Sequence, residues 1–242
     1  MAYGQENRWS VRGAATAPQA AVGIDVGLRE HMLRIYNYMA SGLALTGIVA
    51  YLGATTGLYA SLAQTPLIWV VVFAPIGFAL FFGMRLQAMS YSTAQITFWL
   101  FSAVMGLSLS YIFLRYTGAS IARTFFITAG TFAGMSLYGY TTKTDLSRFG
   151  SFLIMGLWGV VLASIVNMFL LSPGIQFAIS VIGVLVFVGL TAWDTQRIKE
   201  MYFELDDSEM SGKKAILGAL NLYLDFINLF ILLLQFVGTR RD

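Results

Sequence analysis

Seven long apolar runs, separated by short polar connections, constrain the fold of this chain more than any other feature. Each run has about 20 residues, enough to cross the hydrocarbon core of a bilayer as a helix. The runs cover approximately residues 38–59, 66–84, 95–114, 120–140, 149–171, 174–193 and 217–236. We therefore predict an all-α polytopic membrane protein with seven transmembrane helices. Gly53-xxx-Gly57 and Gly130-xxx-Gly134 have the spacing that permits close helix contact.

The composition supports this fold class and excludes several functions. Of the 242 residues, 57% are hydrophobic and 11% are charged, whereas a soluble domain is about half apolar and about a quarter charged. The chain has no cysteine, which excludes disulfides, thiolate metal sites and cysteine nucleophiles. The basic residues lie beside the apolar runs, a pattern typical of membrane orientation rather than of nucleic-acid binding.

The predicted domain organisation has three parts. Residues 1–30 are polar and lack the apolar segment of a signal peptide, so we expect a flexible cytoplasmic N-terminal tail with a short interfacial helix around residues 28–36. Residues 31–238 form the seven-helix membrane domain, and residues 239–242 form a basic C-terminal end. We interpret His31, the one histidine of the chain, as an ordinary surface histidine.

The distribution of Lys and Arg predicts the orientation of the helices. Most basic residues lie on the side of the N-terminus, whereas Arg115 and Arg123 lie on the other side. The positive-inside rule therefore places the N-terminus in the cytoplasm. Arg240 and Arg241 lie outside if the last run crosses the membrane and inside if it bends back, and the residues leave both possibilities open.

The last apolar run contains a carboxylate, Asp225, near its centre. Asn221, Asp225 and Asn228 are spaced i, i+4 and i+7, so they form one polar stripe on a helix whose other faces are apolar. A charged group in hydrocarbon is costly and usually faces the interior of a helix bundle. We therefore expect six helices to surround this central seventh helix and to supply a partner for Asp225.

Asp194, at the end of the sixth run, is the candidate partner. Antiparallel packing of the last two helices can bring the two carboxyl groups together. Asp225 is about 15 Å further along its helix than Ala215, whereas Asp194 lies at the edge of its run. Contact therefore requires a sixth helix that continues through Arg197, or a bundle that is open to water. In the alternative, Asp194 flanks the helix end at the interface and Asp225 bonds only to a neighbouring helix.

Two strings carry a family resemblance, AWDTQRIK at 192–199 and LYLDFINLFILLLQFVG at 222–238. They resemble the sixth- and seventh-segment signatures of the Bax inhibitor-1 family, in its bacterial YccA-like branch of transmembrane Bax inhibitor motif proteins. The resemblance implies that Asp194 and Asp225 share a proton and gate a pH-dependent calcium leak. It also implies that Arg85, in FFGMRLQ, latches onto the pair, and that the protein lies in a bacterial inner membrane.

One departure concerns the second segment. Some relatives have a glutamate in the middle of that segment, where this chain has Phe73, Ala74 and Pro75. An ion path that uses such an acid therefore has no support here.

The expected function is a pH-sensitive calcium leak channel without a tightly bound cofactor. Two carboxylates in contact share one proton, because both cannot ionise cheaply. Asp194 and Asp225 are also the candidate metal ligands, but calcium prefers about six to eight oxygen ligands, so we expect only weak binding. The expected partners are the lipid bilayer, calcium ions and protons, and no nucleic acid.

Two other functions stay open. By the same resemblance, bacterial relatives are associated with restraining a membrane-bound ATP-dependent protease, which implies a regulatory binding protein of the stress or cell-death suppressor type. An intramembrane aspartyl protease also uses two membrane aspartates. Its YD and GxGD motifs differ from TAWD and LYLD in this chain, so we expect that the protein is not an enzyme.

Overall fold

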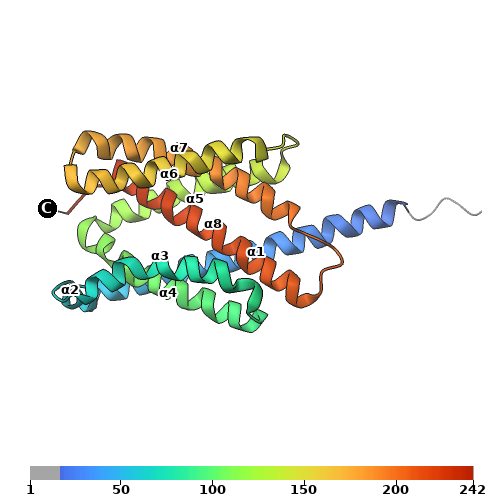
Figure 1. Cartoon of the computed structure of the whole chain (residues 1–242), viewed down its shortest axis with the longest axis horizontal. Helices are drawn as coiled ribbons and strands as arrows, with labels where there is room; N and C mark the ends of the chain where they lie inside the picture. The colour runs from blue at the N-terminus through green and yellow to red at the C-terminus, as the bar shows by residue number, and fades with distance from the viewer. Residues whose placement is uncertain (1–16, 242) are drawn as a thin grey trace, which may run out of the picture.

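The computed structural model describes residues 17–241, which fold into long helices joined by short connections (Figure 1). Seven of the described helices have 19 residues or more, and each coincides with one predicted apolar run. They are α1 (Ala17–Thr55), α3 (Leu67–Arg85), α4 (Tyr91–Arg115), α5 (Gly118–Thr141), α6 (Ser147–Leu170), α7 (Pro173–Glu200) and α8 (Ser208–Val237). The short helix α2 (Leu58–Ala63) follows α1, and the 3₁₀ helix η1 (Leu86–Ala88) follows α3. The prediction of an all-α polytopic membrane protein is confirmed.

Six of these seven helices combine the length and the hydropathy of a membrane span, and α5 is the exception. α5 is 24 residues long, but it carries Arg123 and a stripe of hydroxyl residues. Ser120, Thr124, Thr128 and Ser136 of this stripe are buried, and their spacing by multiples of four places them on one face of the helix. The hydroxyl groups of α5 therefore face the bundle, which lowers the hydropathy of the helix without exposing these groups to lipid.

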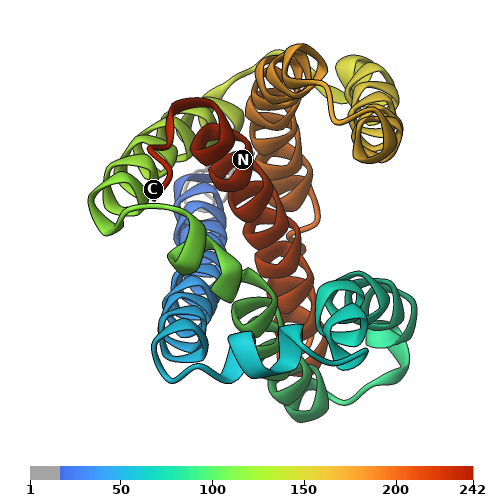
Figure 2. The ribbon, with the colours of Figure 1, turned by 90° about the vertical axis from the view of Figure 1, so that its left-hand side faces the viewer.

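α8 is the central helix of the bundle (Figure 2). It packs against α1, α4, α5 and α7, whereas α3 packs on α4 and α6 packs on α7. Tyr223, Leu222 and Leu229 of α8 are fully buried, as expected for a helix enclosed by others on several sides. The prediction of a central seventh helix is confirmed, but four helices rather than six pack directly against it, with α3 and α6 in the outer positions.

α1 begins earlier than the sequence predicts. It has 39 residues, which correspond to about 59 Å, and its first part projects beyond the other helices (Figure 1). α1 is continuous through the expected boundary at residue 30, so the expected tail is shorter than predicted and no separate interfacial helix forms. Residues 1–16 of the expected tail lie outside the described residues.

His31 is not a surface residue, in contrast to the prediction. It is 4% exposed and its ring packs against Tyr202 of the connection between α7 and α8, with 5.6 Å between the ring centroids. The cause is the continuation of α1, which brings this part of the chain against that connection.

α8 is continuous over 30 residues, about 45 Å, which is long enough to cross a bilayer completely. Residues 238–241 follow it and form a C-terminal strap that pairs with the connection between α4 and α5. Thr117 N donates to Thr239 O at 3.1 Å, and Arg241 N donates to Arg115 O at 2.9 Å. The last apolar run therefore does not bend back, and the strap lies at the same end of the bundle as Arg115.

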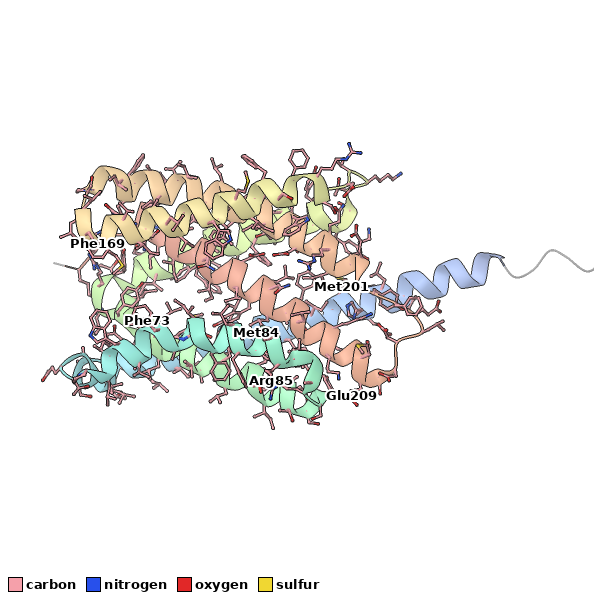
Figure 3. All side chains as sticks on the ribbon, viewed as in Figure 1. Phe73, Met84, Arg85, Phe169, Met201 and Glu209 are labelled. Carbon is pink, nitrogen blue, oxygen red and sulfur yellow. The ribbon has the colours of Figure 1, made fainter. Side chains whose placement is uncertain are left out.

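The two ends of the bundle differ in charge. The strap end contains the C-terminal strap and the connections that follow α4 and α6, and the mixed-charge end contains the connections that precede α4, α6 and α8 (Figure 1). Figure 3 places Arg85 and Glu209 at the mixed-charge end and Phe169 at the strap end. Among the described residues, the strap end has arginines but no carboxylate, whereas the mixed-charge end has both.

Candidate functional site

Asp194 and Asp225 meet where α7 packs against α8. Asp225 lies in the buried central part of α8 and is 5% exposed. Asp194 lies near the C-terminal end of α7, and its carboxyl group is within hydrogen-bonding contact of the Asp225 carboxyl group. The structure therefore brings together the two aspartates that the sequence singled out.

This contact depends on the length of α7. The helix continues beyond its apolar run to Glu200, although the last residues are polar. Gln196 accepts a hydrogen bond from Leu146 N at 2.8 Å. Lys199 donates to the Tyr140 carbonyl at 2.9 Å. These bonds tie the polar end of α7 to the end of α5 and the start of α6, so the aspartate of α7 lies within a continuous helix, as the pairing requires.

The environment of the pair favours one shared proton. Ionised carboxylates only accept hydrogen bonds, so two carboxyl groups bond to each other only when one of them carries a proton. Oδ2 of Asp225 is buried and receives no hydrogen bond from any conventional donor among the described residues. Two ionised carboxylates in contact would repel one another strongly in the low-dielectric interior of a bundle. A pair that holds one proton avoids this repulsion.

A positively charged residue of α7, Arg197, acts electrostatically on the pair. Arg197 lies three residues beyond Asp194, and its charge acts on that carboxyl group. The Arg197 side chain is exposed, and its guanidinium lies over the Trp193 ring, 5.6 Å from the ring centroid. Arg197 therefore acts on the pair from the rim of the bundle.

Arg85 does not reach the pair, which corrects the predicted latch. It is the last residue of α3, its side chain is exposed, and it forms no ion pair among the described residues. Figure 3 shows Arg85 at the mixed-charge end of α3. The 3₁₀ helix η1, which follows Arg85, contacts α8, but the exposed Arg85 side chain points away from the bundle interior and pairs with neither aspartate.

The two asparagines of the predicted polar stripe are half-buried on α8. Asn228 donates its side-chain amide to the Leu224 carbonyl of the same helix at 2.8 Å. Among the described residues, neither Asn221 nor Asn228 hydrogen-bonds to an aspartate. The stripe marks the more polar face of α8 and does not hold the pair.

A chain of hydroxyl groups that the sequence analysis missed lies beside Asp194. Tyr36 Oη is 2.5 Å from Ser136 Oγ, which is 2.9 Å from Thr195 Oγ1. Thr195 donates to the Thr191 carbonyl at 2.7 Å, so the donors of the chain are directed from α1 through α5 to α7. The chain ends at the Thr191 carbonyl, and no hydrogen bond among the described residues joins it to either aspartate.

The hydroxyl chain begins at two apolar hollows. Tyr36 lines hollows of about 770 and 460 Å³ between α1 and α5. Phe132 lines both of them, and Phe226, which follows Asp225, lines the larger one. The smaller hollow also reaches Ser136 of the hydroxyl chain, and neither aspartate lines either hollow.

Metal coordination at the pair is limited to two carboxyl groups. Within the described residues, no group of three or more His, Asp or Glu side chains is arranged to hold a metal ion. Calcium prefers about six to eight oxygen ligands, so an ion at this site would keep most of its water. Two carboxyl groups alone therefore supply too few ligands for a resident calcium ion.

The fold and the site define a class: an all-helical polytopic membrane protein with two carboxyl groups enclosed between its last two helices. The family model described as "Inhibitor of apoptosis-promoting Bax1" matches residues 28–242. This protein belongs to that family, the Bax inhibitor-1 family, which confirms the resemblance of the two strings.

Similar bacterial proteins cover nearly the whole chain. RP147 of Rickettsia prowazekii is 51% identical over 219 residues, which are 90% of this chain and 93% of that protein. The inner membrane protein YbhL of Escherichia coli is 47% identical over 219 residues, which are 89% of this chain and 94% of that protein. A protein of Caulobacter vibrioides is 45% identical over 237 residues, 93% of this chain and 95% of that protein.

Proposed function

We propose that this protein is a pH-sensitive calcium leak pathway of the inner membrane, gated by the Asp194–Asp225 pair. One observation carries the proposal: the carboxyl group of Asp225, buried on the central helix α8, contacts that of the half-buried Asp194 near the end of α7, and neither forms an ion pair among the described residues. Ionisable groups inside a membrane bundle are costly and commonly mark ion or proton pathways.

The protonation state of the pair controls the contact between α7 and α8. With one proton, the two carboxyl groups are joined by a hydrogen bond that holds the helices together. When the proton leaves, the two negative charges repel one another, which favours separation of the helices or entry of a compensating cation. A calcium ion supplies two positive charges and a preference for oxygen ligands. Calcium flux should therefore rise as increasing pH removes the shared proton.

The mixed-charge end supports cation entry. Five carboxylates lie around the connection between α7 and α8: Glu200, Glu204, Asp206, Asp207 and Glu209. Lys213 pairs with Glu209 at 3.2 Å, and Lys214 pairs with Asp206 at 2.5 Å. The other three carboxylates form no ion pair among the described residues and are exposed, so they raise the local concentration of cations.

The substitution Asp225→Asn tests this proposal. An asparagine amide donates permanently to the Asp194 carboxylate, so it imitates the singly protonated pair at every pH. In proteoliposomes that contain a calcium indicator, we expect the wild type to show flux that rises with pH and Asp225→Asn to show low flux without pH dependence.

The control for this experiment is Asp145→Asn. Asp145 is an exposed carboxylate in the connection between α5 and α6, so this variant loses the same charge away from the pair and should behave as the wild type. If Asp225→Asn retains both the wild-type flux and its pH response, the pair is not the gate.

A proteolysis assay separates the leak from an aspartyl protease, which also uses two aspartates that share a proton. The protein is incubated with a labelled transmembrane peptide, and we expect no cleavage. Neither Asp194 nor Asp225 has an adjacent glycine, and the buried Phe226 follows Asp225, which leaves little room for a peptide backbone. If the wild type cleaves the peptide and Asp225→Asn does not, the protein is an aspartyl protease and the leak proposal is wrong.

We also propose regulation of a membrane-bound ATP-dependent protease as a second function, because the first part of α1 projects from the bundle (Figure 1). Such a projecting helix is accessible to a partner protein in the same membrane. Deletion of residues 1–25, which removes the expected tail and the first turns of α1, should weaken co-purification of the protease and leave calcium flux unchanged. Equal co-purification with the deleted and full-length chains would exclude the tail as the docking element.

A further inference from the structure

We propose that the strap end binds an anion of the phosphate class in a polar hollow that is separate from the acid pair. The hollow has a volume of about 240 Å³ and lies between the C-terminal part of α4, the first turns of α7, the end of α8 and the C-terminal strap. Its polar lining comes from Tyr111, Arg115, Gln176, Gln235 and Arg240.

The strap holds one of the two arginines in place. Tyr116 and Arg240 are opposite residues of an antiparallel bridge, so their side chains emerge on the same side of the paired backbones. Thr239 N also donates to Ser120 Oγ at 2.9 Å, and Arg241 donates to the Phe113 carbonyl at 3.1 Å. The strap is therefore fixed to α4 and α5 on both sides of Arg240.

The guanidinium groups of Arg115 and Arg240 are available for a ligand. Among the described residues, neither side chain forms an ion pair or a hydrogen bond, and both are exposed. No carboxylate of the described chain lies at the strap end. Two guanidinium groups on one hollow, without an ion pair among the described residues, attract anions and match the oxygen atoms of a phosphate group.

A chain of hydrogen bonds between side-chain amides orients Gln235 so that its NH₂ group faces the hollow. The backbone N–H of Ser172 donates to Asn167 Oδ1 at 3.0 Å, which fixes the orientation of the Asn167 amide. Asn167 Nδ2 then donates to Gln176 Oε1 at 3.1 Å, and Gln176 Nε2 donates to Gln235 Oε1 at 2.8 Å. The Gln235 oxygen therefore faces Gln176, and the Gln235 NH₂ group has no partner among the described residues and remains as a donor at the hollow.

The lining therefore offers two guanidinium groups, the Gln235 NH₂ group and the Tyr111 hydroxyl, which has no hydrogen-bond partner among the described residues. Donors without a matching acid favour an anion with several oxygen atoms and disfavour a cation. Two sources supply this chemistry at a membrane surface: the phosphate of an anionic lipid headgroup, and free inorganic phosphate.

The experiment uses the full-length protein purified in detergent, with inorganic phosphate and with phosphatidylglycerol as separate probes. The test variant is Arg115→Gln/Arg240→Gln, and the control is Arg123→Gln, which removes an arginine of the same end that neither lines the hollow nor holds the strap. A third variant, Gln235→Glu, keeps the side-chain size and places a carboxylate where the proposal requires a donor.

We measure the thermal unfolding midpoint over a phosphate titration and the retention of phosphatidylglycerol over phosphatidylcholine by native mass spectrometry. Binding of at least one probe to the wild type, weakened about tenfold or more in the test variant and in Gln235→Glu but not in the control, supports the site; a lost charge-assisted hydrogen bond has about this effect. A response to phosphate identifies the free ion, and a response to phosphatidylglycerol alone identifies the lipid.

Equal binding of both probes by wild type, test variant and control overturns the proposal, as does the absence of binding to the wild type. Unfolding midpoints without ligand show whether each variant is folded. If the double test variant is unfolded, Gln235→Glu alone decides between these outcomes.

Discussion

Replacing Gly139 with alanine is expected to force α5 and α7 apart. A Cβ atom at Gly139 would lie 2.9 Å from the carbonyl carbon of Ala192, 3.0 Å from its Cα atom, and closer still to its carbonyl oxygen. Carbon atoms are in optimal contact at about 3.5–4.0 Å, so the two helices must separate by about 0.5–1 Å. The obstacle is backbone, which cannot rotate away as a side chain can.

The magnitude follows from two opposing terms. Overpacking of this kind costs about 1–3 kcal/mol, and the exchange of glycine for alanine within a helix returns about 0.8–1 kcal/mol. For a collision with backbone we expect the upper part of the first range, and hence a net loss of about 1–2 kcal/mol.

The assay compares thermal unfolding midpoints in detergent for Gly139→Ala and for Gly134→Ala. Gly134 is on the same helix, and a Cβ atom there meets nothing within 4 Å, so this control retains the gain in helix propensity without the collision. We expect Gly134→Ala to be as stable as the wild type or more stable. If Gly139→Ala is as stable as Gly134→Ala, α5 and α7 are not in backbone contact and the reasoning fails.

Two further predictions concern polar groups outside the pair. Both ring nitrogens of His31 are buried without a hydrogen-bond partner among the described residues, so His31→Phe, which preserves the packing on Tyr202, should raise the unfolding midpoint by removing a cost of about 1–3 kcal/mol; a lower midpoint would reveal a partner for the ring. Hydrogen bonds from Ser147 lower the pKa of Asp145, so its carboxylate stabilises the fold above the ordinary aspartate pKa of 3.8, and this stabilisation disappears as pH falls through the lower pKa of the folded state. Asp145→Ala should therefore lower the midpoint at neutral pH but not at about pH 2, and an equal loss at both pH values would assign the effect to packing.

Hydropathy located each long helix, because a membrane span has to satisfy its backbone internally and cover itself with apolar side chains. It did not locate the polar end of α7. That extension depends on hydrogen bonds from Gln196 and Lys199 to residues far away in the chain, which hydropathy does not record. The pairing of Asp194 with Asp225 depends on this extension. The two aspartates could therefore be chosen as candidates from the sequence, but their contact could not be predicted from it.

The remaining differences between the sequence-based predictions and the structure arise because the sequence does not show which helices pack against each other. Arg85 was identified by its place at the end of a segment, but the sequence does not show that α3 packs on α4 and lies away from the pair. Gly130 and Gly134 have the spacing of a packing motif and face open space, whereas Gly139 makes the close contact. The hydroxyl residues of α5 recur with a period of four in the sequence. Their hydrogen-bond partners, Tyr36 of α1 and Thr195 of α7, depend on which helices pack against α5 and are known only from the structure.

The unequal charge of the two ends has an electrical consequence. In the proposed leak pathway, a cation would meet carboxylates at the mixed-charge end and, among the described residues, only guanidinium groups at the strap end, so its energy profile would not be symmetric about the membrane centre. Current through such a path should rectify, with cations passing more easily when the voltage drives them in from the mouth with the carboxylates. Removing the arginines of the opposite mouth should make the current–voltage relation straighter.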